Sequence, residues 1–283
     1  ISSRHNPTVM LAASLSDKKN RERERLFRFD GKKLFAEACA CGVDIRYVFL
    51  RENKKDELTL FVNECAKENN IELSECVFVL SEAAFDKICD EKSPEGIITV
   101  AKYIDKLRKI ATINNMTEVI GWASGAPGGR IMAFESLRDP GNLGTVIRTA
   151  AALGIGTLLL SSDCADIYNP RTLRAAMGAL FTRRIVLTDD LSAALRALGG
   201  AGYRTVAAAL SDGGGGYALA RRARLCGHRQ RGTRAFVRCH FRVRYGGDTA
   251  DGARTGHRIT QRIGGCGDIH VALPLSGIRY QRR

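Results

Sequence analysis

Residues 131–163, IMAFESLRDPGNLGTVIRTAAALGIGTLLLSSD, decide the fold class. The apolar start predicts a strand over 131–136, the Gly- and Pro-containing piece after it predicts a loop, and 145–154 has the spacing of an amphipathic helix. The unbroken apolar run at 157–162 predicts a strand buried on both faces. A strand, a helix and a strand in this order form a βαβ unit, so the sequence predicts a parallel sheet.

The same alternation continues to residue 210. Helices are expected over 169–181 and 189–200, and strands over 183–188 and 203–210. Asp190 or Ser192 would cap the helix that starts near residue 190. The second part of the chain is therefore expected to be a parallel sheet covered by helices.

Residues 1–104 are expected to form a separate α/β domain, because they are rich in Lys, Glu and Asn and alternate helical with strand patterns. In the helix expected over 31–42, apolar side chains share one face and Gly42 is the stop signal. That face consists of Leu34, Phe35, Ala38 and Cys39. The other expected elements are strands at 45–51, 76–80 and 96–103, and helices at 57–70 and 81–90, the last with Ser81 as N-cap.

A change of composition separates the two parts. Residues 105–128 hold a short basic helix, expected over 104–110, and then a stretch rich in Gly, Ser and Pro, which is typical of a linker. No Lys follows Lys109 and no Glu follows Glu135. We therefore expect domains at 1–104 and 129–220, with the linker between them and a tail at 221–283.

The net charge of +14 is concentrated in that tail. Residues 221–283 contain 15 Arg, no Lys, no Glu and 3 Asp, so they carry +12 of the total. The rest of the chain is close to neutral. The overall charge therefore indicates a nucleic-acid partner only if the tail is genuine.

Other features exclude several classes of protein. No apolar run reaches the roughly 18 residues that a membrane span needs, and no signal peptide is evident, so a cytoplasmic protein is expected. The nine cysteines include no CxxC pair and are expected to be reduced thiols. Cys39 and Cys41 are expected to pack in a helix and not to bind a metal.

The loop over 137–144 is the best candidate for chemistry, because open α/β sheets bind ligands at the carboxyl ends of their strands. Asn142 could cap the following helix, and Gly144 would allow a close approach of other chain or a ligand. Arg148 is expected on the side of the helix opposite Ile147 and Ala151. Spacing alone leaves two interpretations open, an N-cap with an ordinary surface arginine or a functional site.

The segment DPGNLGTVIRTAAALGI (139–155) resembles the first signature of the SpoU (TrmH-type) RNA ribose 2′-O-methyltransferases, N-x-G-x-x-x-R-T-A. The segment NPRTLRAAMGALF (169–181) is similar to the family's next signature, with Ala176 where Ser is common. Two stretches of the first domain, from residue 6 and around residue 96, resemble the family's L30e-like substrate-binding domain, with Asp30 where Glu is usual. The resemblance covers about residues 1–210.

This resemblance implies an L30e-like domain followed by an α/β-knot (trefoil knot, SPOUT) methyltransferase domain that works as a homodimer. The implied reaction moves a methyl group from S-adenosylmethionine to a ribose 2′-hydroxyl of ribosomal RNA or, as the alternative, transfer RNA. Arg148 and Asn142 match the family's catalytic positions. Because a guanidinium stays protonated, we assign Arg148 to orienting the ribose and stabilising its alkoxide. Thr149, Arg171 and Arg174 are candidate substrate contacts, and for the two arginines of 169–181 a solvated helix face is an equal alternative.

The family's cofactor-binding segments, which read approximately I-G-N-E-G-x-G-L-S and S-L-N-x-S, do not occur after Leu210. Back-translation of HRQRGTRAF (228–236), read one base later, permits I-G-N-E-G-R-G-L-S. The same shift over RITQRIGG (258–265) permits E-S-L-N-A-S. Both motifs return in family order and in one frame, so the sequence predicts a frameshift between about residues 212 and 226. The tail is then expected to lack native-like structure.

Two other interpretations of the tail are a zinc site and an RNA-binding arm. A zinc site could use Cys226, His228, Cys239, His240, Cys266 and His270, but the spacings match no common finger, so no metal is expected. A basic RNA-binding arm fits the charge. It would make the chain a non-catalytic RNA-binding protein that uses the L30e-like domain and the tail. A pseudogene product without activity is the third possibility.

Overall fold

The computed structural model describes residues 1–91, 93–107, 110–112, 117–118, 121, 130–210, 217–219 and 269–274. Contacts between Cα atoms divide the chain into two compact units. The first unit comprises residues 1–111, 143–148 and 165–184, and the second comprises 112–142, 149–164 and 185–283. Two pieces of the predicted methyltransferase domain thus pack with the N-terminal part of the chain.

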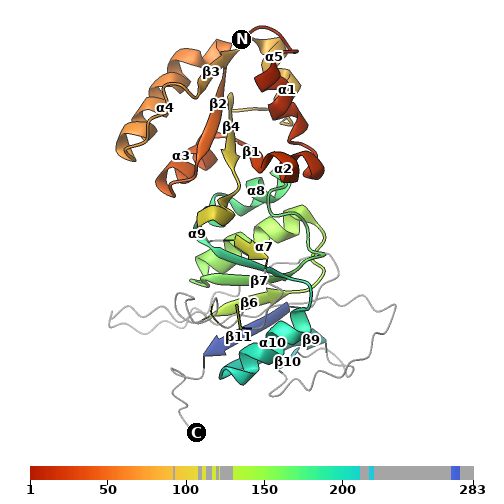
Figure 1. Cartoon of the computed structure of the whole chain (residues 1–283). Coiled ribbons are helices and arrows are strands. Elements are labelled where there is room, and N and C mark those ends of the chain that lie inside the picture. The colour runs from red at the N-terminus through yellow and green to blue at the C-terminus, as the bar shows by residue number, and fades with distance from the viewer. Residues whose placement is uncertain are drawn as a thin grey trace. The chain divides into compact units, whose positions relative to one another are not determined.

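The first unit is built on a four-stranded sheet with the order β1-β4-β2-β3 (Figure 1). Its strands are β1 (Leu26–Asp30), β4 (Ile97–Lys102), β2 (Ile45–Arg51) and β3 (Val77–Leu80). β4 pairs antiparallel with β1 and with β2, while β2 and β3 run parallel. Three of the four strands fall where the sequence analysis predicted them, and β1 is the addition.

Helices cover both faces of this sheet. They are α1 (Pro7–Ser14), α2 (Lys18–Glu24), α3 (Lys32–Ala40), α4 (Lys55–Glu68), α5 (Glu82–Ile88), α8 (Pro170–Ala176) and α9 (Ala179–Thr182), with short 3-10 turns at Glu52–Lys54 and Ile104–Leu107. Figure 1 shows α1 beside α5 and α3 beside α4. The predicted inner face of α3 is confirmed, since all four of its apolar side chains are buried. Ser81 does occupy the N-cap of α5, but its hydroxyl donates to the carbonyl of Ser2 and not to the helix.

Two apolar cores lie on the two faces of the sheet, because successive side chains of a strand point to opposite sides. One core gathers Phe49 with side chains of α1 and α5, among them Val9 and Phe85. The other gathers Val48 and Leu50 with side chains of α3 and α4. β2 therefore contributes to both cores, which explains why its sequence IRYVFLR is nearly continuous in apolar residues.

A buried ion pair ties α2 to the segment that precedes α8. Arg21 is 1% exposed, and its guanidinium donates to the Asp166 carboxylate over 2.5 and 3.2 Å. The remaining nitrogen donates to the carbonyls of Leu15 and Ser16, each over 2.7 Å. A buried charge is tolerated when its hydrogen bonds are satisfied in this way. Nearby, the rings of Phe27, Tyr168 and Phe181 form an aromatic cluster.

The second sheet has the order β10-β9-β11-β6-β7-β8-β5. Its strands are β5 (Ile110–Thr112), β6 (Ile131–Phe134), β7 (Thr157–Ser161), β8 (Arg184–Thr188), β9 (Tyr203–Leu210), β10 (Tyr217–Leu219) and β11 (Ile269–Pro274). β6 and β7 pair in parallel, as predicted. β11 pairs antiparallel with both β6 and β9, so the sheet is mixed and includes residues 269–274 of the tail.

Three elements differ from the prediction. α7 (Pro140–Ala152) begins five residues earlier than predicted, because Asp139 is the N-cap and Pro140 suits the first helical position. The helix predicted over 169–181 breaks into α8 and α9, since Met177 and Gly178 both adopt left-handed backbone. The helix expected over 104–110 is only a 3-10 turn followed by β5.

Two further predictions concern a helix cap and membrane-spanning helices. Of the two residues expected to cap α10 (Leu191–Gly200), Asp190 and Ser192, the structure has Asp190 as the N-cap. Over the residues that the structure describes, no helix is long and apolar enough to cross a membrane.

Among the described glycines, Gly144 leaves the least room for a side chain. A Cβ at this position would lie 2.3 Å from the carbonyl oxygen of Thr172 and 2.6 Å from the Cβ of Ala175. We therefore expect Gly144→Ala to lower the free energy of unfolding by about 1–3 kcal/mol, because the backbones of α7 and α8 must separate. Urea unfolding followed by circular dichroism measures the change.

Gly199→Ala is the matched control, since a Cβ there would meet nothing within 4 Å on α10. It should change stability by less than about 1 kcal/mol and in the stabilising direction, because alanine favours a helix more than glycine does. Equal effects of the two substitutions would contradict the close-contact explanation.

Candidate functional site

The loop between β6 and α7 is held in place by a network of polar side chains from the end of β7. Ser136 has a left-handed backbone with φ of 53°, and its N–H donates to the Ser161 hydroxyl over 2.9 Å. That hydroxyl donates to Asp163 over 2.6 Å, and the Ser136 hydroxyl donates to the same carboxylate. Arg138 adds a contact of 3.2 Å from its guanidinium to Asp163. The carboxylate of Asp163 thus fixes the shape of the loop.

Cys164 closes the other side of this network. Its sulfur accepts from the N–H of Leu137 over 3.4 Å and donates to the carbonyl of Phe134 over 3.7 Å. Burial raises the pKa of the Cys164 thiol. The thiol therefore stays protonated and acts as a packing and hydrogen-bonding group, not as a nucleophile.

Asp163 stays ionised within the network. Burial by itself would raise the pKa of Asp163, but hydrogen bonds from Ser136, Ser161 and Arg138 outweigh it and lower the pKa below the ordinary value of 3.8. A charged Asp163 accepts all of these bonds at neutral pH. The loop is therefore held most firmly when this carboxyl is deprotonated.

The loop leads into the first turn of α7, where Asn142 lies. Asn142 is not the N-cap that the sequence predicted, because the carboxylate of Asp139 takes that role and accepts the Asn142 N–H over 2.8 Å. The side chain of Asn142 is half-buried beside the loop.

Arg148 lies one turn beyond Gly144 on α7, and residues four apart share a face of a helix. The side chain is exposed, while its neighbour Ile147 is fully buried, as the sequence predicted. Its guanidinium makes no hydrogen bond or ion pair with any residue that the structure describes. Arg148 is thus available to a ligand.

Gly144 places α7 directly against α8. The contact with Thr172, Ala175 and Ala176 shows that the missing side chain serves a helix–helix approach, which is the first of the two uses proposed for it. Gly154 follows the last turn of α7 and is exposed, so it does not belong to the buried face of this helix.

The other candidate substrate contacts differ in their surroundings. Arg171 is exposed on the first turn of α8, and Thr149 is half-buried next to Arg148. Arg174 is already paired with the carboxylate of Glu91. Both arginines have exposed side chains, so both remain candidates for a contact with a phosphate.

Asp30 lies near the Arg174–Glu91 pair. Burial raises the pKa of Asp30 to about 6, against the opposing effect of Arg28. The guanidinium of Arg28 is buried and donates to the carboxylate of Asp90. This group of charges is a structural one in the first unit, and it adds no residue to the loop site.

The sequence analysis did not identify Ser136, Ser161, Asp163 or Cys164. The sequence did contain a signal for these four residues. All of them lie at the end of one of two neighbouring parallel strands or within three residues after it, where polar side chains converge. The five zinc candidates from Cys226 to Cys266 lie outside the described residues, and His270 belongs to β11. In the part of the chain that is described, no three His, Cys, Asp or Glu side chains are grouped to hold a metal.

Comparison with known proteins agrees with this arrangement. Residues 129–220 match the SpoU rRNA Methylase family, and residues 6–99 match the MRM3-like substrate binding domain. The 23S rRNA (guanosine(2553)-2′-O)-methyltransferase RlmP of Bacillus subtilis is 27% identical over 213 residues, which are 75% of this chain and 74% of RlmP. The mitochondrial rRNA methyltransferase 3 of Xenopus tropicalis is 29% identical over 61% of this chain, but the chain spans only 38% of that relative.

Solved structures show the same fold. The AdoMet-bound rRNA methyltransferase of Sinorhizobium meliloti aligns with a TM-score of 0.54 at 23% identity, over 72% of this chain and 69% of that one. The α/β architecture is therefore confirmed, whereas the trefoil knot would be completed by segments outside the described residues. The likeness to these structures shows the fold, and the two family matches assign a methylase-type domain to residues 129–220 and a substrate-binding domain to residues 6–99. The chain thus joins a stretch that matches the MRM3-like substrate binding domain to a stretch that matches the SpoU rRNA Methylase family.

The charge on Asp163 makes a testable contribution to stability. Because the folded pKa is lower than the unfolded one, this contribution is present above about pH 4 and is lost as the pH falls through the folded value. We expect Asp163→Asn to be less stable than the parent chain at pH 6, and the difference to shrink toward pH 3. Denaturant unfolding at a series of pH values measures it. A difference that stays constant over this range would show that Asp163 is not the group holding the loop.

Proposed function

We propose that this protein is an rRNA ribose 2′-O-methyltransferase by descent, in which the loop over 135–142 and Arg148 form the substrate half of the site. The observation that carries the proposal is the exposed guanidinium of Arg148, which is held on a helix of a SpoU domain and has no partner among the described residues. RlmP and the mitochondrial methyltransferase 3 of Xenopus are both named as rRNA methyltransferases, which supports ribosomal over transfer RNA.

The proposed chemistry assigns each side chain a limited task. The ribose 2′-hydroxyl must become more anionic as it is methylated, and the permanent positive charge of Arg148 would stabilise that oxygen and orient the ribose. Asn142, in the first turn of the same helix, would help to position it. Thr149 and Arg171 would contact the neighbouring backbone of the RNA, with Arg174 available only after it leaves Glu91.

S-adenosylmethionine is the methyl donor that the comparisons support, because the AdoMet-bound rRNA methyltransferase of Sinorhizobium meliloti has the same fold, but the residues that would hold it are not identified in this chain. In the family, the segments that hold this methyl donor follow the position of Leu210, and neither cofactor motif occurs in this chain. The donor would supply the methyl group, but no residue of this chain can be assigned to binding it.

We propose that the loss results from a shift of reading frame between about residues 212 and 226. Two observations support this proposal, namely the position where the family match ends and the motif that the shifted frame restores. The match to the SpoU family ends at residue 220, just before the stretch whose shifted reading restores the first motif. The basic charge of residues 221–283 would then result from the genetic code and not from selection for RNA binding.

Several predictions from the sequence remain part of this proposal. They are the domain limits 1–104 and 129–220, the linker 105–128, the out-of-frame tail 221–283, the homodimer and the cytoplasmic location. Most of the linker and the tail lies outside the described residues. The competing function is a non-catalytic RNA-binding protein, which is favoured by one observation. The match to the substrate-binding domain covers residues 6–99, while the motifs of the cofactor half are absent.

The first test is binding of S-adenosylmethionine. Isothermal titration calorimetry should detect no micromolar binding to the chain as given. Restoring the frame by a single-base change in the region encoding 212–226 should recover binding, because both motifs return. Micromolar binding to the present chain would refute the frameshift proposal.

The second test concerns Arg148 in the frame-restored protein. Arg148→Ala should lower methyl transfer to rRNA about 100-fold or more, measured with a radiolabelled donor, because the charge on the reacting oxygen loses its stabilisation. The melting temperature should hardly change, since the side chain is exposed. Arg196→Ala on α10 is the control, because that arginine is also exposed and lies outside the site. Equal activity in the two variants would remove Arg148 from the mechanism.

A further inference from the structure

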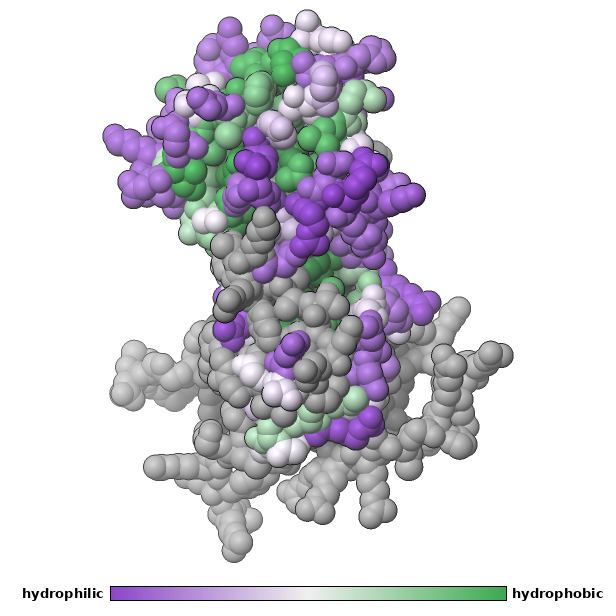
Figure 2. Space-filling model, in the orientation of Figure 1, coloured by the Kyte–Doolittle hydropathy of each residue, from purple (hydrophilic) through white to green (hydrophobic). Residues whose placement is uncertain are grey.

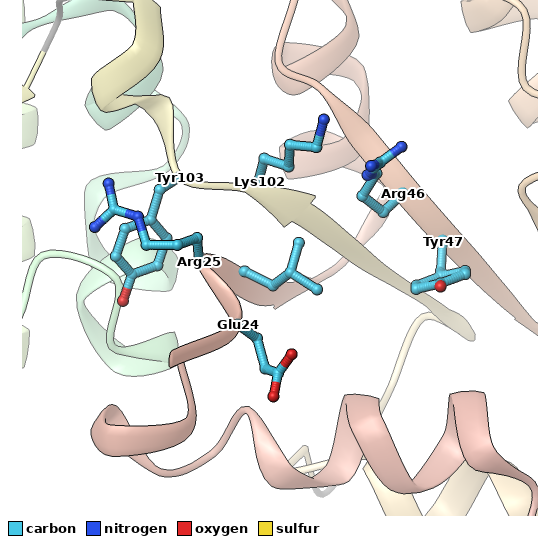
Figure 3. Close-up of a pocket in the computed structure, with 7 residues that line it drawn as sticks. Glu24, Arg25, Arg46, Tyr47, Lys102 and Tyr103 are labelled. Carbon is cyan, nitrogen blue, oxygen red and sulfur yellow. The ribbon is translucent and has the colours of Figure 1, made fainter. Parts of the chain in front are cut away.

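A cavity of about 470 Å³ opens in the first unit, away from the loop site. It is lined by residues from the end of α2, the start of β1, the start of β2 and the end of β4 (Figure 3). These residues are Glu24, Arg25, Leu26, Arg46, Tyr47, Lys102 and Tyr103. Three cations and two tyrosines thus line the cavity together with Leu26 and one carboxylate, Glu24, and cations beside aromatic rings suit a nucleotide.

Arg25 is held in a rigid stack beside this cavity. Its guanidinium carbon lies 4.6 Å from the centre of the Tyr103 ring (Figure 3). The ring of Tyr168 stacks on Tyr103 at 3.9 Å between centroids and an angle of 17°. Two groups this close to one ring cannot share a face, so Arg25 and Tyr168 cover opposite faces of Tyr103. The outer face of the Arg25 guanidinium is therefore the open end of a three-layer stack.

Other bonds keep this stack in one arrangement. Asp105 pairs with Arg25 and also accepts a hydrogen bond of 3.0 Å from the Tyr168 hydroxyl. The backbone of Arg25 is left-handed, and its N–H caps α2 by donating to the carbonyl of Arg21. Burial raises the pKa of Tyr103 to about 12, so this ring stays neutral. Arg25 nevertheless keeps 56% of its side chain exposed, which leaves its plane accessible.

Arg46 provides a charge without a partner. It lies at an irregularity of β2, between the pairings of Ile45 and Tyr47 with β4, and such a bulge redirects a side chain out of the regular pattern. The side chain is exposed and makes no hydrogen bond or ion pair with the described part of the chain. Figure 3 shows it beside Lys102, whose ammonium lies 2.6 Å from Asp44. Figure 2 shows a hydrophilic surface over the neighbouring α2, KKNRERE.

We infer that this pocket binds one nucleotide of single-stranded RNA, with the base on the open face of Arg25 and the adjoining phosphate at Arg46 and Lys102. The inference rests on the proposed function only in taking RNA as the substrate. Unpaired bases stack well on guanidinium planes, and a phosphate satisfies a free arginine. The pocket would hold a part of the RNA other than the nucleotide being methylated.

Cross-linking locates the contact even though the tail is basic. The full chain is irradiated with a short single-stranded RNA that contains 4-thiouridine, and the modified peptides are identified by mass spectrometry. Cross-links are expected on peptides that contain Arg25, Tyr47 or Tyr103. Cross-links confined to residues 221–283 would refute the pocket, and so would the absence of any cross-link to the first unit.

Substitutions measure the two parts of the contact by fluorescence anisotropy with the same RNA. Arg25→Lys keeps the charge opposite Asp105 but loses the plane, and should weaken binding at least about fivefold. Arg46→Ala should weaken binding and lower the slope of log K against log salt by about one. Lys87→Ala, an exposed lysine on α5, is the control and should change neither quantity. Melting temperatures establish that each variant is folded.

The outcomes separate this inference from the proposed function, because neither assay contains a methyl donor. Loss of binding in Arg25→Lys and Arg46→Ala supports the pocket whether or not the chain methylates RNA. Binding of all three variants equal to that of the parent chain overturns it, even if methyl transfer is later observed. Equal competition by a single-stranded RNA, a free nucleotide and an acidic peptide would also overturn it, since the site would then select charge alone.

Discussion

The absence of a side chain at Gly144 is the constraint on which the candidate active site depends. Because the backbone of α7 contacts that of α8 there, Arg148 is held one turn away on a helix that cannot shift outward. The same contact keeps Arg171 and Arg174 on a helix packed against α7. One glycine thereby positions the cationic candidates of both family signatures relative to one another.

A second constraint comes from Asp163, which fixes the loop ahead of α7. The carboxylate collects hydrogen bonds from the ends of two strands and from Arg138, so the loop is shaped before any RNA arrives. Preorganised polar groups are effective in catalysis because they need not rearrange during the reaction. A loop of fixed shape, followed on α7 by an arginine that has no partner among the described residues, is therefore the strongest physical argument that this region is a site.

Much of the fold could be predicted because short-range patterns determine it. β2 and β9 have the predicted bounds, and the buried face of α3 was predicted residue by residue. The errors arose where one residue outweighs a pattern, as when Asp139 started α7 early and Met177 and Gly178 divided a helix. The Asp163 network and the stack on Tyr103 join residues far apart in the chain, and no periodicity reports such contacts. Arg148 was found because it belongs to a short local signature.

The buried pair of Arg21 and Asp166 also limits which exchanges of its two parts this chain could tolerate. The arginine belongs to the substrate-binding part and the aspartate to the methylase part, according to the two family matches. A hybrid that took one part from a relative with a neutral residue at either position would bury an unpaired charge, at a cost of about 3–5 kcal/mol. The two halves are therefore expected to be inherited together, or to exchange only among relatives that carry both charges.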